Sequence, residues 1–166
     1  MNIFVLDRDP KKAAEYLNDK HIVKMPLESA QMLSTVQRIN GSIVDNLYRQ
    51  SHLRHPCTNW SSASKQNYKW HYELFFHMAK EYERRFLKQH KSFIALHEYL
   101  EYPPEILPDI GLTPFVQVLP DMYKHEDAVI AYRNYYTAHK LSFSTWRHPA
   151  AVPDWVLQHV KQNSRS

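Results

Sequence analysis

The sequence predicts an all-α protein, and three features lead to that prediction. Only 2 of the 166 residues are glycine, whereas hairpin-rich β folds and phosphate-binding loops need glycine at positive φ or at close backbone approaches. Apolar residues recur every three or four positions over long stretches, which is the spacing of one helix face. Proline, asparagine and serine separate these stretches. We expect residues 1–166 to form a single compact domain of about five to six helices around one long central helix.

The first forty residues contain a short apolar segment followed by two helices. Ile3–Leu6 is either a short strand or a buried N-terminal arm. Asp9-Pro10 combines a capping acid with proline at the first helical position, so a helix begins there and ends near Leu17. Asp19 caps a second helix. Pro26 lies inside it and either kinks the helix or restarts it, because proline lacks a backbone donor.

The longest helix is expected to begin at Thr58 or Ser61 and to extend to His90. Its aromatic and aliphatic side chains from Trp60 to Phe86 fall on one arc of a helical wheel. Five prolines between residues 102 and 124 make that segment an extended loop. Shorter helices are expected at residues 92–101, 125–140 and 153–160.

Charge and aromatic content favour a nucleic-acid partner. The net charge is +4, and the chain has 11 Tyr, 7 Phe and 4 Trp; cations neutralise phosphates and flat rings stack on bases. The single Cys57 excludes an intramolecular disulfide. No apolar run approaches the ~20 residues of a membrane span, and the N-terminus lacks a signal-peptide pattern. We therefore expect a cytoplasmic protein that binds DNA, in double-stranded form, and no membrane.

A polar stripe on the second helix is the first candidate site. His21, Lys24, Glu28, Gln31 and Thr35 are spaced by three or four residues and share one face if the helix continues through its proline. The stripe is either a solvated face with one lysine–glutamate ion pair or the lining of an active site. Histidine, glutamate, glutamine and threonine together supply proton transfer, charge stabilisation and hydrogen bonds, which favours the active site.

The segment R-H-P-C-T-N-W, residues 54–60, is the second candidate. Free N–H groups at the start of the long helix, together with Arg54, suit a DNA phosphate. His55 and Asn59 lie beside them. The alternative is a plain capped helix start with Trp60 in the core.

The third candidate is an aromatic and basic stretch, residues 131–148. Arg133, Lys140 and Arg147 suit phosphates, and Tyr136 and Trp146 suit stacking on bases. The alternative is that the tyrosines, which recur at helical spacing, belong to the core.

Two groups of side chains resemble metal ligands in type only. One is a set of histidine and cysteine side chains in a loop: His52, His55 and Cys57. The other is a row on the long helix: Glu73, His77 and Glu81. The loop set has no partner motif, and the row lacks the matching second helix of bundle metal sites. We therefore expect no metal or other cofactor, and we expect the row to lie on the surface.

With these clusters in place, the chain resembles the pyrimidine-dimer DNA glycosylase family of the phage endonuclease V type. Asp19-x-His21 followed by Glu28 is similar to that family's D-x-H pattern, with its catalytic glutamate seven residues after the histidine. The helix end E-Y-E-R-R-F, residues 81–86, resembles the end of the family's central helix. Y-R-N-Y-Y-T-A-H-K, residues 132–140, is similar to its C-terminal W-Y-K-Y-Y-G-K-A segment.

The resemblance implies a DNA repair enzyme, a glycosylase that is also an abasic-site lyase. An amine attacks the sugar C1′ to form a Schiff base, and a carboxylate stabilises the positive charge. Glu28 would be that carboxylate, with His21 beside it. The family attacks with the α-amine exposed when the initiator methionine is removed, but the bulky Asn2 normally prevents removal. The amine is then the α-amine of Met1 or the side chain of Lys24.

Two other functions remain open at this stage. Gln31 stands where the family has an arginine that contacts DNA, which leaves room for a relative acting on another modified base or lacking the lyase step. A nucleobase- or nucleotide-modifying enzyme on the same scaffold is one alternative. A non-catalytic nucleic-acid-binding module is the other.

Overall fold

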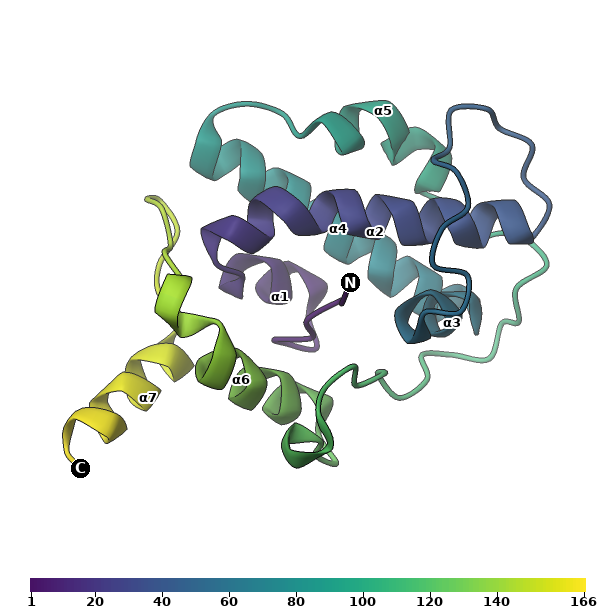
Figure 1. The fold of residues 1–166 in the computed structure, drawn as a ribbon. Coiled ribbons are helices and arrows are strands. Elements are labelled where there is room, and N and C mark those ends of the chain that lie inside the picture. The colour runs from purple at the N-terminus through teal and green to yellow at the C-terminus, as the bar shows by residue number, and fades with distance from the viewer.

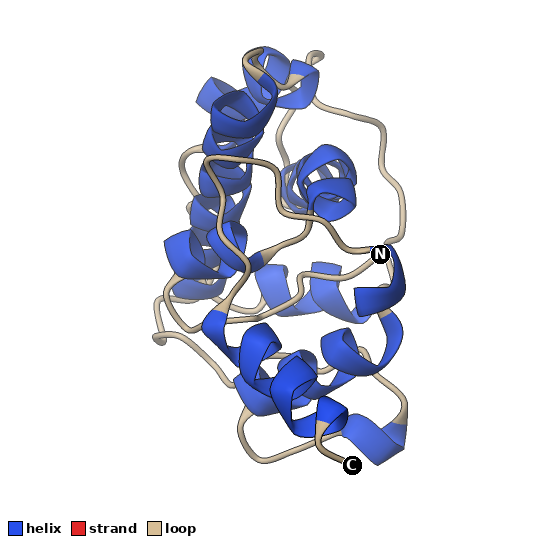
Figure 2. Cartoon of the chain, turned by 90° about the vertical axis from the view of Figure 1, so that its left-hand side faces the viewer, coloured by secondary structure: helices blue, strands red, loops and turns tan.

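The computed structural model describes residues 1–166 and consists of helices and loops, with no strand (Figures 1 and 2). The all-α prediction is confirmed, with seven α-helices rather than five or six. They are α1 (Pro10–Tyr16), α2 (Asp19–Ile39), α3 (Pro56–Ser62), α4 (Lys65–Phe86), α5 (Lys91–Leu100), α6 (Ala128–His139) and α7 (Asp154–Ser164), with 3-10 turns η1 (Asp121–Tyr123) and η2 (Leu141–Phe143).

The two long helices, α2 and α4, run side by side in opposite directions and form the middle of the molecule (Figure 1). An apolar cluster that includes Leu33, Phe75 and Leu96 fills the space between them and α5. A second cluster joins them to the N-terminal arm, α1, α3 and α6, and it includes Ile22 and Tyr132. The expected extended loop at residues 102–124 crosses to α6, and α7 projects at the edge.

The N-terminal segment is the buried arm, not a strand. Ile3, Phe4, Val5 and Leu6 are at most 5% exposed, and they belong to the apolar cluster under α2. Asn2 is also buried. Its Oδ1 accepts from the Ile3 N–H at 2.8 Å, and its Nδ2 donates to the Val118 carbonyl at 3.0 Å. The arm is thus held from both sides, and only Met1 reaches outward.

Helix α2 begins with Asn18 rather than Asp19 as its cap. The Asn18 side chain accepts from the His21 N–H at 2.9 Å, which satisfies one free donor of the first turn. The helix continues through Pro26 to Ile39 without restarting. Because the helix continues through Pro26, the predicted polar residues from His21 to Thr35 lie on one face of α2.

The expected single helix from residue 58 to 90 is two helices, α3 and α4. The break falls at Ala63 and Ser64, where Ser64 caps α4 by accepting from the Asn67 N–H at 3.0 Å. The Ser64 hydroxyl also donates to the Gly111 carbonyl in the proline-rich loop. The apolar spacing continues across the break, so periodicity alone did not reveal it.

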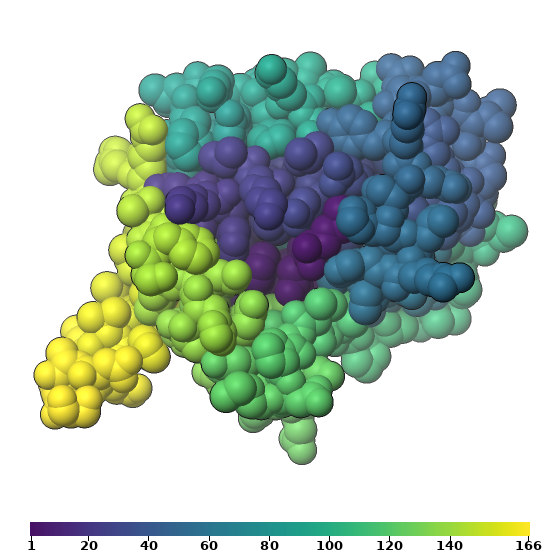
Figure 3. Space-filling model, viewed as in Figure 1, coloured from purple at the N-terminus to yellow at the C-terminus, as the bar shows by residue number.

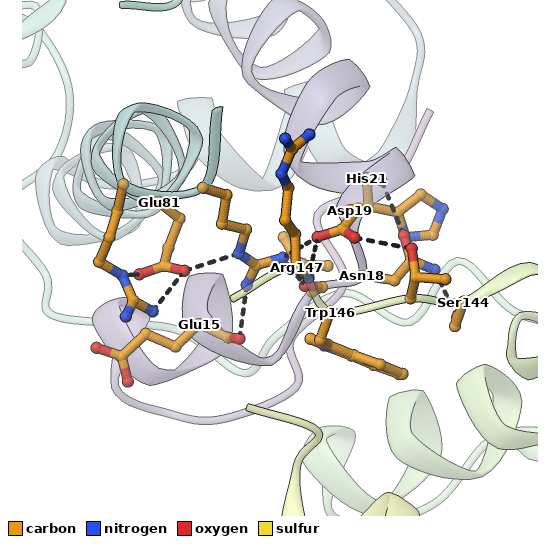
Figure 4. Close-up of polar contacts among 12 residues, drawn as sticks. Glu15, Asn18, Asp19, His21, Glu81, Ser144, Trp146 and Arg147 are labelled. Carbon is orange, nitrogen blue, oxygen red and sulfur yellow. Dashed lines mark hydrogen bonds and ion pairs between the residues drawn. The ribbon is translucent and has the colours of Figure 1, made fainter. Parts of the chain in front are cut away.

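A buried arginine ties the ends of three helices together (Figure 4). Arg85 is 2% exposed and donates to the Leu17 carbonyl at 2.7 Å, the Glu15 carbonyl at 3.0 Å and the Asp19 carboxylate at 3.2 Å. Its Nε donates to Glu81 at 3.0 Å. Arg85 therefore holds the end of α1, the start of α2 and the end of α4 as one unit.

Glu81 corrects one expectation from the sequence. It was expected on the surface but is only 6% exposed. It accepts from both Arg84 and Arg85 at 2.8–3.0 Å, because a carboxylate buried at this helix junction needs ionic partners. None of the helices is long and apolar enough to pass through a membrane.

Candidate active site

A hollow on one face of the molecule exposes the N-terminal end (Figure 3). The purple arm lies at its floor, bordered by α2, by the segment leading into α3 and by the chain from the proline-rich loop to α6. An open cavity of about 290 Å³ lies here. Its lining residues are Met1, Asn2, Phe4, His21, Lys24, Met25, Val118, Tyr135 and Lys140.

Glu28 is a buried carboxylate with one oxygen unused. The residue is 9% exposed, and its Oε1 lies 3.5 Å from the Lys24 ammonium. Its Oε2 is buried and has no hydrogen-bond partner. An unpaired buried carboxylate oxygen is unfavourable for stability, so its presence points to a role with a ligand.

The α-amine of Met1 and the carboxylate of Glu28 act on the same two side chains at the start of α3. Burial lowers the pKa of His55; the Met1 ammonium and then His52 lower it further, while the Met1 carbonyl and Glu28 oppose them. Burial raises the pKa of Cys57 to about 12, with the N-terminal ammonium opposing and Glu28 adding to the shift. The Met1 amine and the Glu28 carboxylate therefore both lie close enough to His55 and Cys57 to shift the pKa values of these two side chains.

His55 is oriented by the helix that it caps. Its Nδ1 accepts from the Cys57 N–H at 3.1 Å, which holds the imidazole against the first turn of α3. The Met1 carbonyl is close enough to favour the protonated ring. The start of α3 thus provides a wall beside Met1.

His21 forms the opposite wall, inside the cavity. Phe4 has a φ of 39°, unusual for a residue with a side chain, and its ring stacks on His21 with centroids 4.6 Å apart. The Nδ1 of His21 lies 2.9 Å from the Tyr136 hydroxyl. Burial, with the ammonium groups of Lys140 and Lys24, lowers the pKa of His21 to about 4.

The comparison with known families bears on this arrangement. The family model described as pyrimidine dimer DNA glycosylase matches residues 1–95, more than half of the chain. The chain belongs to the pyrimidine dimer DNA glycosylase family. The resemblance expected from the sequence is therefore confirmed, and the family implies a DNA substrate. No curated protein and no solved structure matches the chain.

The family match contains the arm, α1 to α4 and the candidate groups Met1, His21, Glu28 and His55. Residues 96–166 lie outside it, including Tyr136 and all of α6 and α7. The chain thus combines a part matched by the family model with a C-terminal part that also lines the cavity.

The predicted stripe on α2 divides into two parts. His21 and Lys24 line the hollow, and Glu28 lies 3.5 Å from the Lys24 ammonium. The Thr35 hydroxyl instead donates to the Ser51 carbonyl at 3.0 Å and holds the loop before α3. Gln31, between the two parts, is half-buried.

Three of the predicted DNA-contacting side chains are exposed, and a fourth lines the cavity. Arg54 and Asn59 are exposed near the start of α3. Arg147 is exposed, with its guanidinium 5.4 Å from the centre of the Phe86 ring. Lys140 lines the cavity. These positions are available to a phosphate backbone.

Three further predicted DNA contacts, besides Gln31 and His55, are occupied within the protein. Tyr136 is 0% exposed, so its ring has no surface to offer a base, and the core alternative is correct for it. Arg133 donates to the Leu6 carbonyl at 2.8 Å and to Asp7 at 3.2 Å. Trp146 is half-buried and donates to the Tyr16 carbonyl at 3.0 Å.

Sequence reasoning did not identify Phe4, Tyr135 or Val118 as parts of the site. The apolar pattern of the arm gave no sign that Phe4 stacks on a histidine. Tyr135 and Val118 come from distant parts of the chain, which only the fold brings together. No three histidine, cysteine, aspartate or glutamate side chains come together as metal ligands.

Proposed function

We propose that this protein is a DNA glycosylase with abasic-site lyase activity, acting on a modified base in double-stranded DNA. The α-amine of Met1 is the nucleophile, and Glu28 is the carboxylate that stabilises the cationic intermediates. One observation carries the proposal: the Glu28 Oε2 is buried without a partner, and its carboxylate acts on His55 and Cys57, the two side chains that the Met1 ammonium also reaches. The family match supports the choice of substrate class.

The proposed reaction uses only groups of the chain and of DNA. The lone pair of the amine attacks C1′, and the bond to the base breaks, with its electron pair leaving on the base, which takes up a proton. Loss of the amine proton and opening of the sugar produce a Schiff base. Removal of a C2′ proton then expels the 3′ phosphate, and water hydrolyses the Schiff base. Glu28 stabilises the charge at C1′ and carries protons between these steps.

Lys24 is the competing nucleophile, and its surroundings favour a different role. Its side chain is 66% exposed and its ammonium lies 3.5 Å from Glu28, so it is engaged in an ion pair at the surface. As a class, α-amines have pKa values near 8, against about 10.4 for lysine, so a terminal amine is more readily neutral. We assign Lys24 to holding Glu28 and to attracting the phosphate backbone.

Borohydride trapping on abasic duplex DNA tests the assignment of the amine. The expected result is a covalent adduct on the peptide that begins at Met1, identified by mass spectrometry. Lys24→Gln should still be trapped. A Gly-Ser extension before Met1 should abolish trapping, because it moves the amine out of the hollow, whereas the same extension after Ser166 should not.

Two results would contradict the proposal. One is an adduct on the peptide that contains Lys24. The other is trapping that survives the N-terminal extension. The intact mass of the untreated protein reports in the same experiment whether Met1 is retained.

A further inference from the structure

A chain of hydrogen bonds runs from the start of α2 through Tyr136 to His21. The Asn18 N–H donates to the Tyr136 hydroxyl at 2.9 Å, and that hydroxyl lies 2.9 Å from the His21 Nδ1. Asn18 and Tyr136 are both 0% exposed. Neither bond can therefore be replaced by bulk water.

The donor and the acceptor in each of these bonds follow from where the protons of Asn18, Tyr136 and His21 can lie. The Tyr136 oxygen already accepts from a backbone N–H, and burial raises its pKa, so the hydroxyl keeps its own proton. His21 Nδ1 is the one acceptor within reach of that proton. Tyr136 therefore donates to Nδ1, and a neutral imidazole that accepts at Nδ1 carries its proton on Nε2.

The second ring nitrogen of His21 remains free. Nε2 has no hydrogen-bond partner in the protein, yet it is not among the buried unpartnered atoms, which are Glu28 Oε2, Ser51 Oγ, Thr58 Oγ1 and Trp155 Nε1. His21 lines the cavity beside Met1. The Nε2–H is thus a donor open to that cavity.

We propose that Tyr136 is a positioning residue that fixes the proton of His21 on Nε2, so that His21 donates a hydrogen bond to an acceptor atom of the nucleotide bound beside Met1. The nucleotide's presence in the cavity rests on the proposed function. In this form His21 donates and does not accept at Nε2, so it matches a carbonyl oxygen of a pyrimidine ring and not an amino group.

The charges around His21 keep it in the neutral form. Lys140 faces it from the end of α6 and Lys24 from α2, while Tyr136 donates to it from α6. Each of these groups disfavours an imidazolium. Phe4 stacks on the ring and Phe143 lies edge-on to it, so no carboxylate offsets the cations from those sides.

Nitrogen NMR of the histidine rings in the free, full-length protein tests the hydrogen-bond chain. Wild-type His21 should show an unprotonated Nδ1 and a protonated Nε2 at pH 7. Tyr136→Phe should raise the population with the proton on Nδ1 and raise the His21 titration midpoint, because the donor that favours the neutral form is gone.

Tyr132→Phe is the matched control. Tyr132 lies on the same helix, is 0% exposed, donates to the Val116 carbonyl at 2.8 Å and accepts from the Val118 N–H at 3.2 Å. It loses equivalent buried hydrogen bonds without contact to His21. A wild-type His21 with its proton on Nδ1 would overturn the proposal, as would equal His21 spectra for the two variants.

Activity measurements separate positioning from folding. His21→Gln places an amide donor near the Nε2 position and should retain more activity than His21→Asn, whose amide is nearer to Nδ1. Tyr136→Phe should lower kcat/KM by roughly tenfold through loss of one positioned hydrogen bond. Equal losses for the Gln and Asn variants would contradict the donor role. Because the NMR result needs no DNA, its failure is distinguishable from failure of the trapping experiment.

Discussion

Residues 1–95 and residues 96–166 contribute to the candidate site in different ways. The first region, which the family model matches, contains the groups that we propose to take part in the reaction: Met1, His21 and Glu28. The second supplies groups that hold them, such as Tyr136 against His21 and Val118 against Asn2. The contrast indicates that the reactive groups belong to the family core, while their orientation depends on a part of the chain that the family match does not include.

One place where the two regions are joined is the start of α2 (Figure 4). The Asp19 carboxylate accepts from the Arg147 N–H at 2.9 Å and from the Thr145 hydroxyl at 2.7 Å, and the Asp19 N–H donates to the Thr145 carbonyl at 2.8 Å. Arg85 holds Asp19 from the other side. The same turn of α2 therefore carries both the junction and His21.

The largest expected effect comes from the reactive group of the first region. Glu28→Gln should lower glycosylase activity by roughly 10²- to 10³-fold, because it removes the charge that stabilises the cationic intermediate. DNA affinity, measured by fluorescence anisotropy, should change little. Glu73→Gln, an exposed change on α4, is the control and should behave as wild type. Equal activity of the two variants would remove Glu28 from the mechanism.

Arg85→Met tests the buried network that supports Asp19 from the side of the first region. It removes one ionic partner each from the buried Glu81 and from Asp19 and leaves the Leu17 and Glu15 carbonyls without their donor, so the unfolding free energy should fall by about 3–5 kcal/mol. Arg84→Met removes only the partner whose side chain is 42% exposed and should cost less than about 1 kcal/mol. Urea unfolding measures both. Similar losses would mean that the buried network of Arg85 stabilises the fold no more than an exposed ion pair does.

The loss of stability at low pH should distinguish two buried histidines. His71 bonds only to residues of the first region, whereas His21 bonds to Tyr136 of the second. Burial lowers the pKa of His71, which bonds Ser61 and Ser29, to about 3, and the pKa of His21 is lowered to about 4. The unfolded chain binds protons from about pH 6.5 downward, so stability is full above that pH and falls as the pH drops toward 4.

His71→Gln should therefore flatten this loss and leave the part due to His21 and to the other two histidines with lowered pKa values, His55 and His77. The slope removed is at most about 1.4 kcal/mol per pH unit. Urea unfolding at pH 7, 5.5 and 4.5 provides the measurement. An unchanged slope in the variant would show that His71 is not buried in its neutral form.

The smallest expected effect is a local one at the end of α4. Leu87 is 88% exposed and has a φ of 57°, a left-handed conformation that suits glycine. Leu87→Gly should stabilise the protein by about 0.5–1 kcal/mol, whereas Leu87→Ala keeps the strained backbone and should change little. Thermal unfolding measures both, and neither variant should alter activity, since Leu87 contacts neither site nor junction.

The sequence was most informative where contacts are local. Helical spacing placed His21, Lys24 and Glu28 on one face of α2, and the structure keeps that face. It was uninformative where a capping serine interrupts a continuous apolar pattern, as at Ser64. It was also uninformative for contacts between distant residues. Tyr136 has the spacing of a core residue and of a base platform alike, and only its complete burial in the folded chain decides between them.

The late position of two cavity-lining residues in the chain has a consequence for protein synthesis. Met1 is made first, but the cavity beside it is completed by Tyr135 and Lys140, near the other end of the chain. A nascent chain that has emerged only through α5 therefore contains the arm and α2 without the wall that faces them. The complete cavity forms only after α6 leaves the ribosome, so prematurely terminated chains lack it.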